Sequence, residues 1–289
     1  MDVTPRRYGG ESREGDFEIV WTAVLGVFLK EWRQVNKYQS WVISTVEDIV
    51  SFTLPLILAS YALRSTVGTD EFQALTRTAS PEAYLAAGAS VWLWLISALW
   101  STGSVLRTEM RQGTLEVLLT SPVSILVWAF SVSVFRLALS APSVMLHVLI
   151  IAVASGINLL KVNWLLVFVT AVIGSVALGG LGLAYGGIII RYKDTGAFGN
   201  LLRALFWVLS GSTYSLSVFP RYLQVVAALL PTTYVIDLTR RAFLNAGAFG
   251  SVRGIVVLII EAGVLSSFGL WVLRRLLREA RTEGTLSTF

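Results

Sequence analysis

The stretch from Leu106 to Val123 reads LRTEMRQGTLEVLLTSPV and is a short polar interruption between two long apolar runs. Gly113 weakens any continuous helix there, because glycine costs about 1 kcal/mol against alanine in a helix interior. Thr114 can cap a new short helix, with Glu116 near its positive N-terminal end. The Ser-Pro pair at 121–122 ends that helix, because the residue before a proline avoids the α region, and the proline suits the first turn of the next helix. The stretch therefore predicts a small helix at the membrane face, jointed at both ends.

The composition is typical of a polytopic membrane protein. Apolar residues make up 55% of the 289-residue chain, charged residues make up 14%, and the mean hydropathy is +0.69. The chain has no cysteine and one histidine, His147, which leaves no thiolate metal site and no histidine cluster. Residues 1–16 are polar and lack an apolar core, so we expect a cytoplasmic tail there rather than a secretory signal.

Long apolar segments predict an all-α protein with six membrane spans. The expected spans are residues 41–63, 80–106, 122–155, 164–190, 198–219 and 250–273. Glycine and serine crowd the fourth span, which predicts close helix packing within one subunit. Residues 17–40 are amphipathic with tryptophans and basic residues at the edge, as in helices that lie in the membrane interface. The predicted units are a tail at 1–16, an interfacial helix at 17–40, a six-span domain at 41–277 and a tail at 278–289.

A second unusual region follows the fifth expected span. Pro220 and Pro231 bound an apolar run, residues 222–230, which is too short to cross the ~30 Å hydrocarbon layer. Such a run beside a span predicts a re-entrant hairpin at 220–234. The polar residues from Tyr234 to Arg241 are then expected to return the chain to water.

Two parts of the chain resemble one known family. The string EMRQGTLEVLLTSPV at 109–123 is similar to the cytoplasmic contact helix of permease subunits in type-2 ABC exporters. The patterns SGxxYxxxxFP at 210–220 and LPTTYxxDxxR at 230–240 resemble the extracellular half-helices of the same permeases. The amphipathic segment at 17–40 is similar to their N-terminal elbow helix.

The resemblance implies a dimer, or a pair with a related permease, that docks on two copies of a separate ATPase subunit. The implied ATPase-contact residues are Glu109, Arg111, Gly113, Thr114, Leu115, Glu116, Leu118, Leu119 and Pro122. The implied outer-gate residues are Gly211, Tyr214, Phe219, Pro220, Pro231, Tyr234, Asp237 and Arg240. ATP-Mg is expected on the partner and no cofactor on this chain, because the sequence has no GxxxxGK[ST] phosphate-binding motif.

Ionisable residues inside the expected spans are candidates for function, because a charge in the bilayer is costly. Arg136 and Glu261 lie at comparable depths, so we expect them to pair or to face the translocation route, with a purely structural pair as the alternative. Glu47 and Asp48 are expected near the cytoplasmic boundary or facing a wet cavity. His147 is expected to be a hydrogen-bonded packing residue.

Charge bias predicts the orientation. Lysines and arginines are about twice as frequent on the side of the termini as on the other side, so the positive-inside rule places both termini and the contact helix in the cytoplasm of a cell-membrane protein. The resemblance favours an amphiphilic drug or lipid-like substrate, with a lipid-linked glycan as the alternative. An ion-coupled carrier or a membrane-embedded enzyme that uses Arg136, Asp237 and Glu261 is the alternative from another class; no inverted repeat of broken helices supports the carrier.

Overall fold

The structure of the chain is a computed structural model, and it describes residues 21–22, 24–33, 43, 46–66, 81–114, 118, 120, 124–192, 196–244 and 248–282. Every regular element in these ranges is helical, which confirms the all-α fold class. Residues 24–33 form the N-terminal helix. The elements that follow are η1 (Ile49–Thr53), α3 (Leu54–Thr66), α5 (Pro81–Arg111), α7 (Ile125–Ser155), η2 (Leu159–Lys161), α8 (Trp164–Tyr192), α9 (Gly196–Ser210), η3 (Leu216–Val218), α10 (Arg221–Ala227), α11 (Pro231–Leu244) and α12 (Ala248–Thr282).

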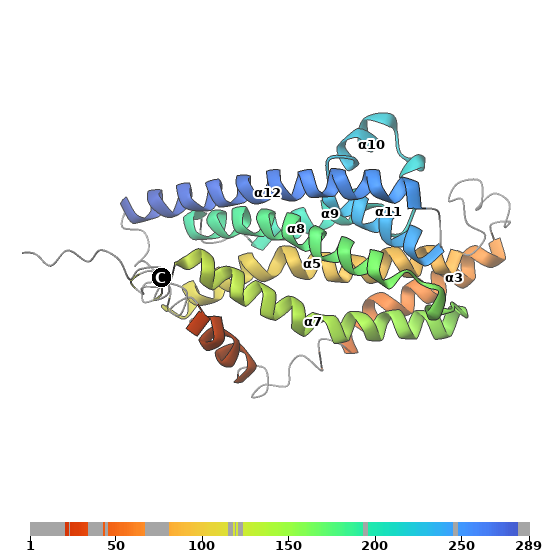
Figure 1. The fold of residues 1–289 in the computed structure, drawn as a ribbon, viewed down its shortest axis with the longest axis horizontal. Helices are drawn as coiled ribbons and strands as arrows, with labels where there is room; N and C mark the ends of the chain where they lie inside the picture. Colours follow the sequence, from red (N-terminus) through yellow and green to blue (C-terminus); the bar gives the residue numbers. More distant parts are fainter. Residues whose placement is uncertain are drawn as a thin grey trace, which may run out of the picture.

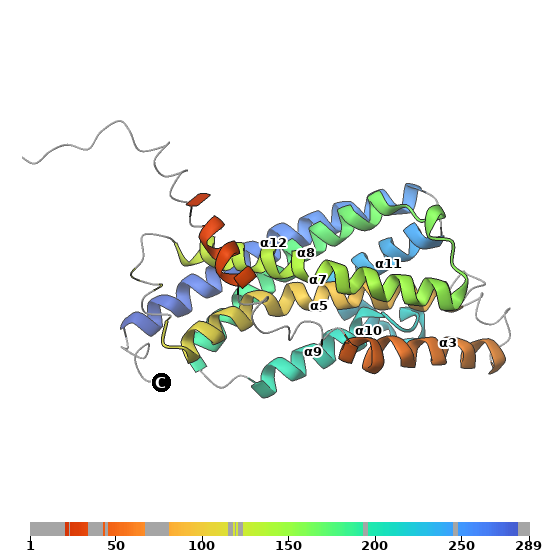
Figure 2. The same cartoon turned by 90° about the horizontal axis from the view of Figure 1, so that it is seen from below.

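Four long helices run side by side along the long axis of the molecule (Figure 1). α8 packs against both α12 and α5, and α5 also packs against α7. α11 lies across α5, α8 and α12 at one end of the bundle, while α3 and α9 lie along one side (Figure 2). The N-terminal helix and the C-terminal ends of α5 and α12 gather at the opposite end from α10 and α11 (Figure 1).

By length and composition, four described helices suffice to cross a membrane. Their apolar windows are Ala83–Ser101, Val127–Ala154, Trp164–Tyr192 and Ser251–Ala280. These windows match the second, third, fourth and sixth predicted spans. α10 and α11 meet at 87° and add a fifth, broken span if the pair is counted as one. The described helices thus supply four or five spans where the sequence predicted six.

The first predicted span is interrupted by a π-turn. η1 occupies Ile49–Thr53 and α3 continues from Leu54. Pro55, the expected kink, stands directly after this turn. Because proline has no N–H, one carbonyl in the preceding turn loses its helical donor, and a π-turn is a common way to accommodate such a break.

The fifth predicted span, 198–219, is wrong in length. α9 has 15 residues and ends at Ser210, which gives it a length of about 22 Å at 1.5 Å per residue, short of the ~30 Å apolar layer. Gly211 follows with φ +66°, a left-handed conformation that glycine adopts without strain. The chain then runs irregularly through η3 to Pro220.

The prediction that residues 234–241 return the chain to water is also wrong. They belong to α11, whose Val235, Ile236, Leu238 and Thr239 are buried against the bundle. Asp237 lies on the exposed side of this helix. α11 has one apolar face and one polar face, so its mean hydropathy is low. The low mean hydropathy of this segment therefore did not indicate a helix packed in the bundle.

The closest helix contact lies between α8 and α12. A methyl group at position 269 would lie 1.8 Å from the carbonyl oxygen of Gly180, and one at position 180 would lie 2.6 Å from the backbone of Ser266. Only glycine at both positions allows the two backbones to approach this closely. The small-residue packing predicted for the fourth span is therefore confirmed at Gly180.

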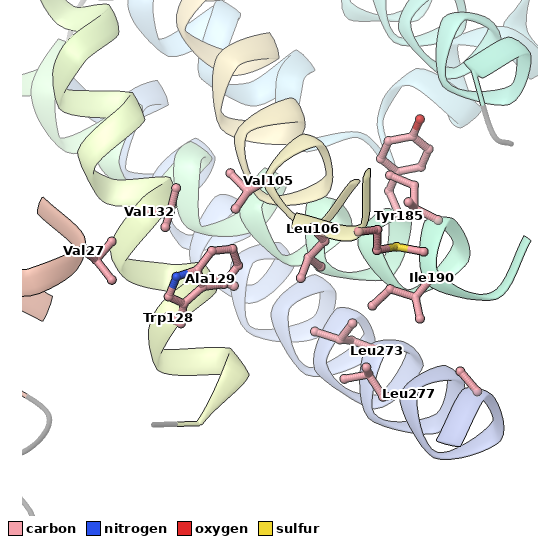
Figure 3. Packing of buried hydrophobic residues seen from close by; sticks show 13 residues of the cluster. Val27, Val105, Leu106, Trp128, Ala129, Val132, Tyr185, Ile190, Leu273 and Leu277 are labelled. Atoms are coloured by element: carbon pink, nitrogen blue, oxygen red, sulfur yellow. The ribbon is translucent and has the colours of Figure 1, made fainter. Parts of the chain in front are cut away.

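A cluster of buried hydrophobic side chains packs the bundle at the end where α5 ends (Figure 3). It joins the N-terminal helix through Val27 to α5, α7, α8 and α12. Leu273 and Leu277 of α12 are part of it, and Ala280 is fully buried. α12 therefore continues as a packed helix to Thr282, whereas the sequence had ended the span at 273 and begun a tail at 278.

We predict that Gly269→Ala destabilises the protein by about 3 kcal/mol, the upper end of overpacking costs, because α12 must move away from α8. Gly263→Ala is the matched control on the same helix, since nothing lies within 4 Å of its added methyl group. Thermal unfolding of the detergent-purified protein measures both variants. Equal melting temperatures for the two variants would contradict the close contact.

Candidate functional site

Residues 113–122, called the contact segment below, follow the end of α5. Gly113 has φ +69°, its N–H donates to the carbonyl of Met110 at 3.1 Å, and the N–H of Thr114 donates to the carbonyl of Glu109 at 3.0 Å. These two bonds form a Schellman motif, which ends a helix at a left-handed glycine. Gly113 therefore breaks the helix as predicted, but Glu109 and Arg111 belong to the last turns of α5 and not to a separate contact helix.

A new helical turn starts at Thr114. The N–H of Leu118 donates to the carbonyl of Thr114 at 3.0 Å, so Thr114 stands at the head of the turn, where the sequence placed it. Leu118 is half-buried against the cluster of Figure 3, and Arg111 is exposed. The remaining predicted contact residues, which are Leu115, Glu116, Leu119 and Pro122, lie outside the described residues.

The next helix does not begin at Pro122 as predicted. α7 begins at Ile125, and Ser124 caps it by accepting a hydrogen bond from the N–H of Val127 at 3.2 Å. A serine cap satisfies one of the N–H groups that the first turn leaves without a helical acceptor.

The carboxylate of Glu109 makes its contacts inside the protein. Its side chain is almost buried at 8% exposure, and Lys30 of the N-terminal helix donates to Oε1 at 2.6 Å. The hydroxyl of Thr114 donates to Oε2. Both carboxylate oxygens are thus used within the chain, where they join the N-terminal helix to Thr114. The predicted pairing of Glu109 with an ATPase stays a prediction.

The neighbouring residue, Glu31, makes a second tie. Its carboxylate lies 3.5 Å from Nε of Arg136 on α7, and Nη1 of Arg136 donates to the hydroxyl of Ser104 on α5 at 3.3 Å. Arg136 therefore pairs with Glu31, whereas the sequence had suggested Glu261. Glu261 lies on α12, and its buried Oε2 has no hydrogen-bond partner among the described residues.

We call the set of Lys30, Glu31, Glu109, Thr114 and Arg136 the charged junction. It links the N-terminal helix to the contact segment on one side and to α7 on the other. Sequence reasoning missed Lys30 and Glu31 because they looked like polar residues at the edge of an interfacial helix. An adjacent pair of opposite charges in a segment otherwise rich in apolar residues was the available signal.

Arg136 also lines a cavity of about 390 Å³ between α5, α7 and α9. A second cavity of about 230 Å³ shares Trp100 and Arg203 with the first. Asp48 lines the larger cavity, as predicted for a charge facing a wet space, and so does His147. His147 is buried, and its Nδ1 donates to the carbonyl of Ser143 at 2.6 Å, so it is hydrogen-bonded as expected.

The other end of the bundle is held by Arg240. Its Nη2 donates to the carbonyls of Gly211 and Ser212, both at 2.7 Å. Its guanidinium lies 3.6 Å from the ring centroid of Tyr84 on α5, a close cation–π contact. Arg240 therefore fastens the end of α9 to α5 and α11.

The other predicted gate residues fall in the connection from α9 to α11. Tyr214 donates to the carbonyl of Val208 and packs edge-on against Phe219 at 5.3 Å. Pro220 precedes α10, Pro231 is the first residue of α11, and Tyr234 donates to the carbonyl of Ala228 at 3.0 Å. Asp237 stands apart, because it pairs with Arg241 at 2.8 Å on the exposed side of α11.

A bundle of long apolar helices with a polar cavity and a charged junction at one end defines a multi-pass membrane protein. Residues 24–244 match the ABC-2 type transporter family. The match covers more than half of the chain, which therefore belongs to that family as a type-2 ABC permease subunit. The resemblance seen in the sequence is confirmed.

A named relative agrees with the family. The chain is 25% identical to the linearmycin resistance permease protein LnrN of Bacillus subtilis (strain 168) over 206 residues. The aligned region covers 68% of this chain and 50% of the relative. The chain thus spans about half the length of that protein.

We predict that Arg240→Gln lowers stability by about 2 kcal/mol, because hydrogen bonds from a charged donor each contribute about 1.5–3 kcal/mol. Arg241→Gln removes the same charge from the next residue and loses only an exposed ion pair, worth about 0.5 kcal/mol. Thermal unfolding of both purified variants makes the comparison. The assignment of Arg240 as the fastening residue fails if Arg241→Gln is the more damaging change.

Proposed function

We propose that the chain forms the membrane path of an ATP-driven exporter and is not itself an ATPase. It would work as a homodimer or with a related permease, on two copies of a separate ATPase subunit that binds ATP-Mg. The substrate would be an amphiphilic drug or lipid-like molecule, which agrees with the resistance permease named above. The observation that carries this proposal is the charged junction, because it connects the contact segment to the polar cavity.

The arrangement of the ends supports the orientation. The N-terminal helix and the C-terminal ends of α5 and α12 lie together at one end of the bundle (Figure 1). Arg274, Arg275 and Arg278 lie on α12 at this end. By the positive-inside rule this is the cytoplasmic end, the side on which an ATPase would dock.

The junction suggests how movement reaches the cavity. A partner that pulls on the contact segment moves Thr114, which is bonded to Glu109 through both backbone and side chain. Glu109 carries the movement to Lys30, and the adjacent Glu31 holds Arg136 in the cavity wall. The buried cluster makes these parts move as one body, because close-packed interiors transmit displacement.

A dimer is supported by the apolar surface of the short helix. Leu201, Leu205 and Val208 of α9 are exposed, and α9 lies at the edge of the bundle beside α3 (Figure 2). Exposed apolar side chains on a membrane helix face either lipid or another helix. A second copy that covers α9 would lie beside Arg203, the residue of α9 that lines both cavities.

We predict that Glu116→Lys uncouples ATP hydrolysis from export while the permease still reaches the membrane, because the new charge repels the basic surface that the glutamate is expected to contact. The ATPase activity and export of the reconstituted complex are measured together. Glu279→Lys is the control, since Glu279 is an acid on α12 at the same end of the bundle, paired with Arg275. Normal export by Glu116→Lys would contradict the proposal that this glutamate contacts the ATPase.

We predict that Lys30→Glu and Glu109→Lys each reduce export, because each leaves like charges facing one another across the junction. The double reversal should restore most of the loss, since opposite charges are again paired. The exposed Arg275–Glu279 pair, reversed in the same way, is the control and should change little. Coupling between Lys30 and Glu109 is disproved if the double variant is as impaired as the sum of the two single variants.

A further inference from the structure

The two cavities share one aromatic residue and one arginine in their walls. Trp100 and Arg203 line both of them, and the guanidinium of Arg203 lies 5.3 Å from the centroid of the indole ring. The larger cavity has a volume of about 390 Å³, within the range of about 300–1,000 Å³ that small-molecule sites occupy.

The walls of the two cavities are cationic. Arg107 of α5, Arg136 of α7 and Arg203 of α9 line them, whereas Asp48 is the acid among the described lining residues. Glu31 lies outside the lining and pairs with Arg136 at 3.5 Å. Arg203 lines both cavities, and the planar fork of arginine suits phosphate or carboxylate oxygens.

Polar atoms at the site lack partners. The Nε1–H of Trp100 is buried, and among the described residues it has no hydrogen-bond acceptor. His147 is 1% exposed; its Nε2 likewise has no partner in the described part of the chain, while Nδ1 is bonded to Ser143. A buried donor or acceptor without a hydrogen bond costs about 1–3 kcal/mol. A ligand that supplies oxygens and hydroxyl groups would give both atoms a hydrogen-bond partner.

The larger cavity also has apolar side chains in its wall. Leu93, Ile96, Leu139 and Val144 line it, together with three serines, Ser97, Ser140 and Ser143. A ligand that fits this cavity therefore has an apolar part beside its polar group. Such a division describes an amphiphile better than a free inorganic ion.

The depth of the cationic part fits a lipid headgroup. Arg107 lies about 6 Å from the end of α5 at Arg111, and Trp100 about 17 Å from it, at 1.5 Å per residue. On the orientation proposed above, this range reaches from the headgroups of the inner leaflet into its upper acyl region. An amphiphile held there keeps its charged group near the interface and its apolar part within the membrane.

We propose that the paired cavities bind the anionic headgroup of an amphiphile, a phosphate or a carboxylate, at Arg203, which lines both cavities, with the N–H of Trp100 as a further donor. This inference rests on the proposed export function, because the bound amphiphile would be the class of molecule that the path accepts. The binding itself needs neither ATP nor a partner. The shared chemistry covers two sources, a resident anionic lipid and a transported anionic compound.

The test measures binding of dioctanoyl-phosphatidylglycerol and dioctanoyl-phosphatidylcholine to the purified full-length chain by native mass spectrometry in a neutral detergent. The two probes share their tails and differ in net headgroup charge. We expect the anionic probe to bind about tenfold more tightly, a difference of about 1.4 kcal/mol. Arg203→Gln should abolish this preference, and because Arg203 is exposed its replacement disturbs little packing.

Arg221→Gln is the matched control, since it removes the same charge from an exposed residue of α10 at the other end of the bundle. Trp100→Phe keeps an aromatic ring, though a smaller one, and removes the N–H, and it should weaken binding of the anionic probe several-fold. Equal binding of the two probes, or an equal loss in Arg221→Gln and Arg203→Gln, would overturn the proposal. Inorganic phosphate that competes as strongly as the anionic probe would overturn the amphiphile part.

A second measurement separates the sources. If the anionic probe stimulates ATP hydrolysis by the complex with its ATPase, the site takes transported amphiphiles; if it binds and stabilises without stimulation, the site holds a resident lipid. Both outcomes support the headgroup site. Failure to find any ATPase partner would defeat the proposed function and leave the binding result standing.

Discussion

A charge inside an apolar bundle needs a partner, and this requirement organises the molecule at both ends. A lone buried ion costs several kcal/mol, which an opposite charge or several hydrogen bonds can offset. Glu109 is met by Lys30 and Thr114, Arg136 by Glu31 and Ser104, and Arg240 by two carbonyls and the ring of Tyr84. Each tie joins elements that are distant in the sequence, so local electrostatic needs fix the tertiary arrangement.

Aromatic side chains provide the second kind of tie. The ring of Trp207 on α9 lies 5.2 Å from Phe52 of η1 and 5.1 Å from Trp92 of α5, in edge-on contacts. Trp94 donates to the hydroxyl of Ser175 on α8 at 2.7 Å. These tryptophans connect helices within the bundle and position α9 beside α5 and η1.

α5 connects the cavities to the charged junction. It contributes Trp100 to the cavities, Ser104 to the side chain of Arg136, and Glu109 to the junction, within three turns of one helix. Gly113 then ends the helix in a left-handed conformation that glycine adopts without strain.

The sequence by itself determined the helical class, most of the long spans, the break at Gly113 and the family. Long apolar runs, glycine and proline act locally, so their effects can be read without a fold. Only the tertiary structure decided that Glu109 is internal, that Arg136 pairs with Glu31 rather than Glu261, that α9 is short, and that α11 packs inside the bundle. Those outcomes depend on which side chains meet across helices, and sequence spacing carries no information about partners more than a few turns apart.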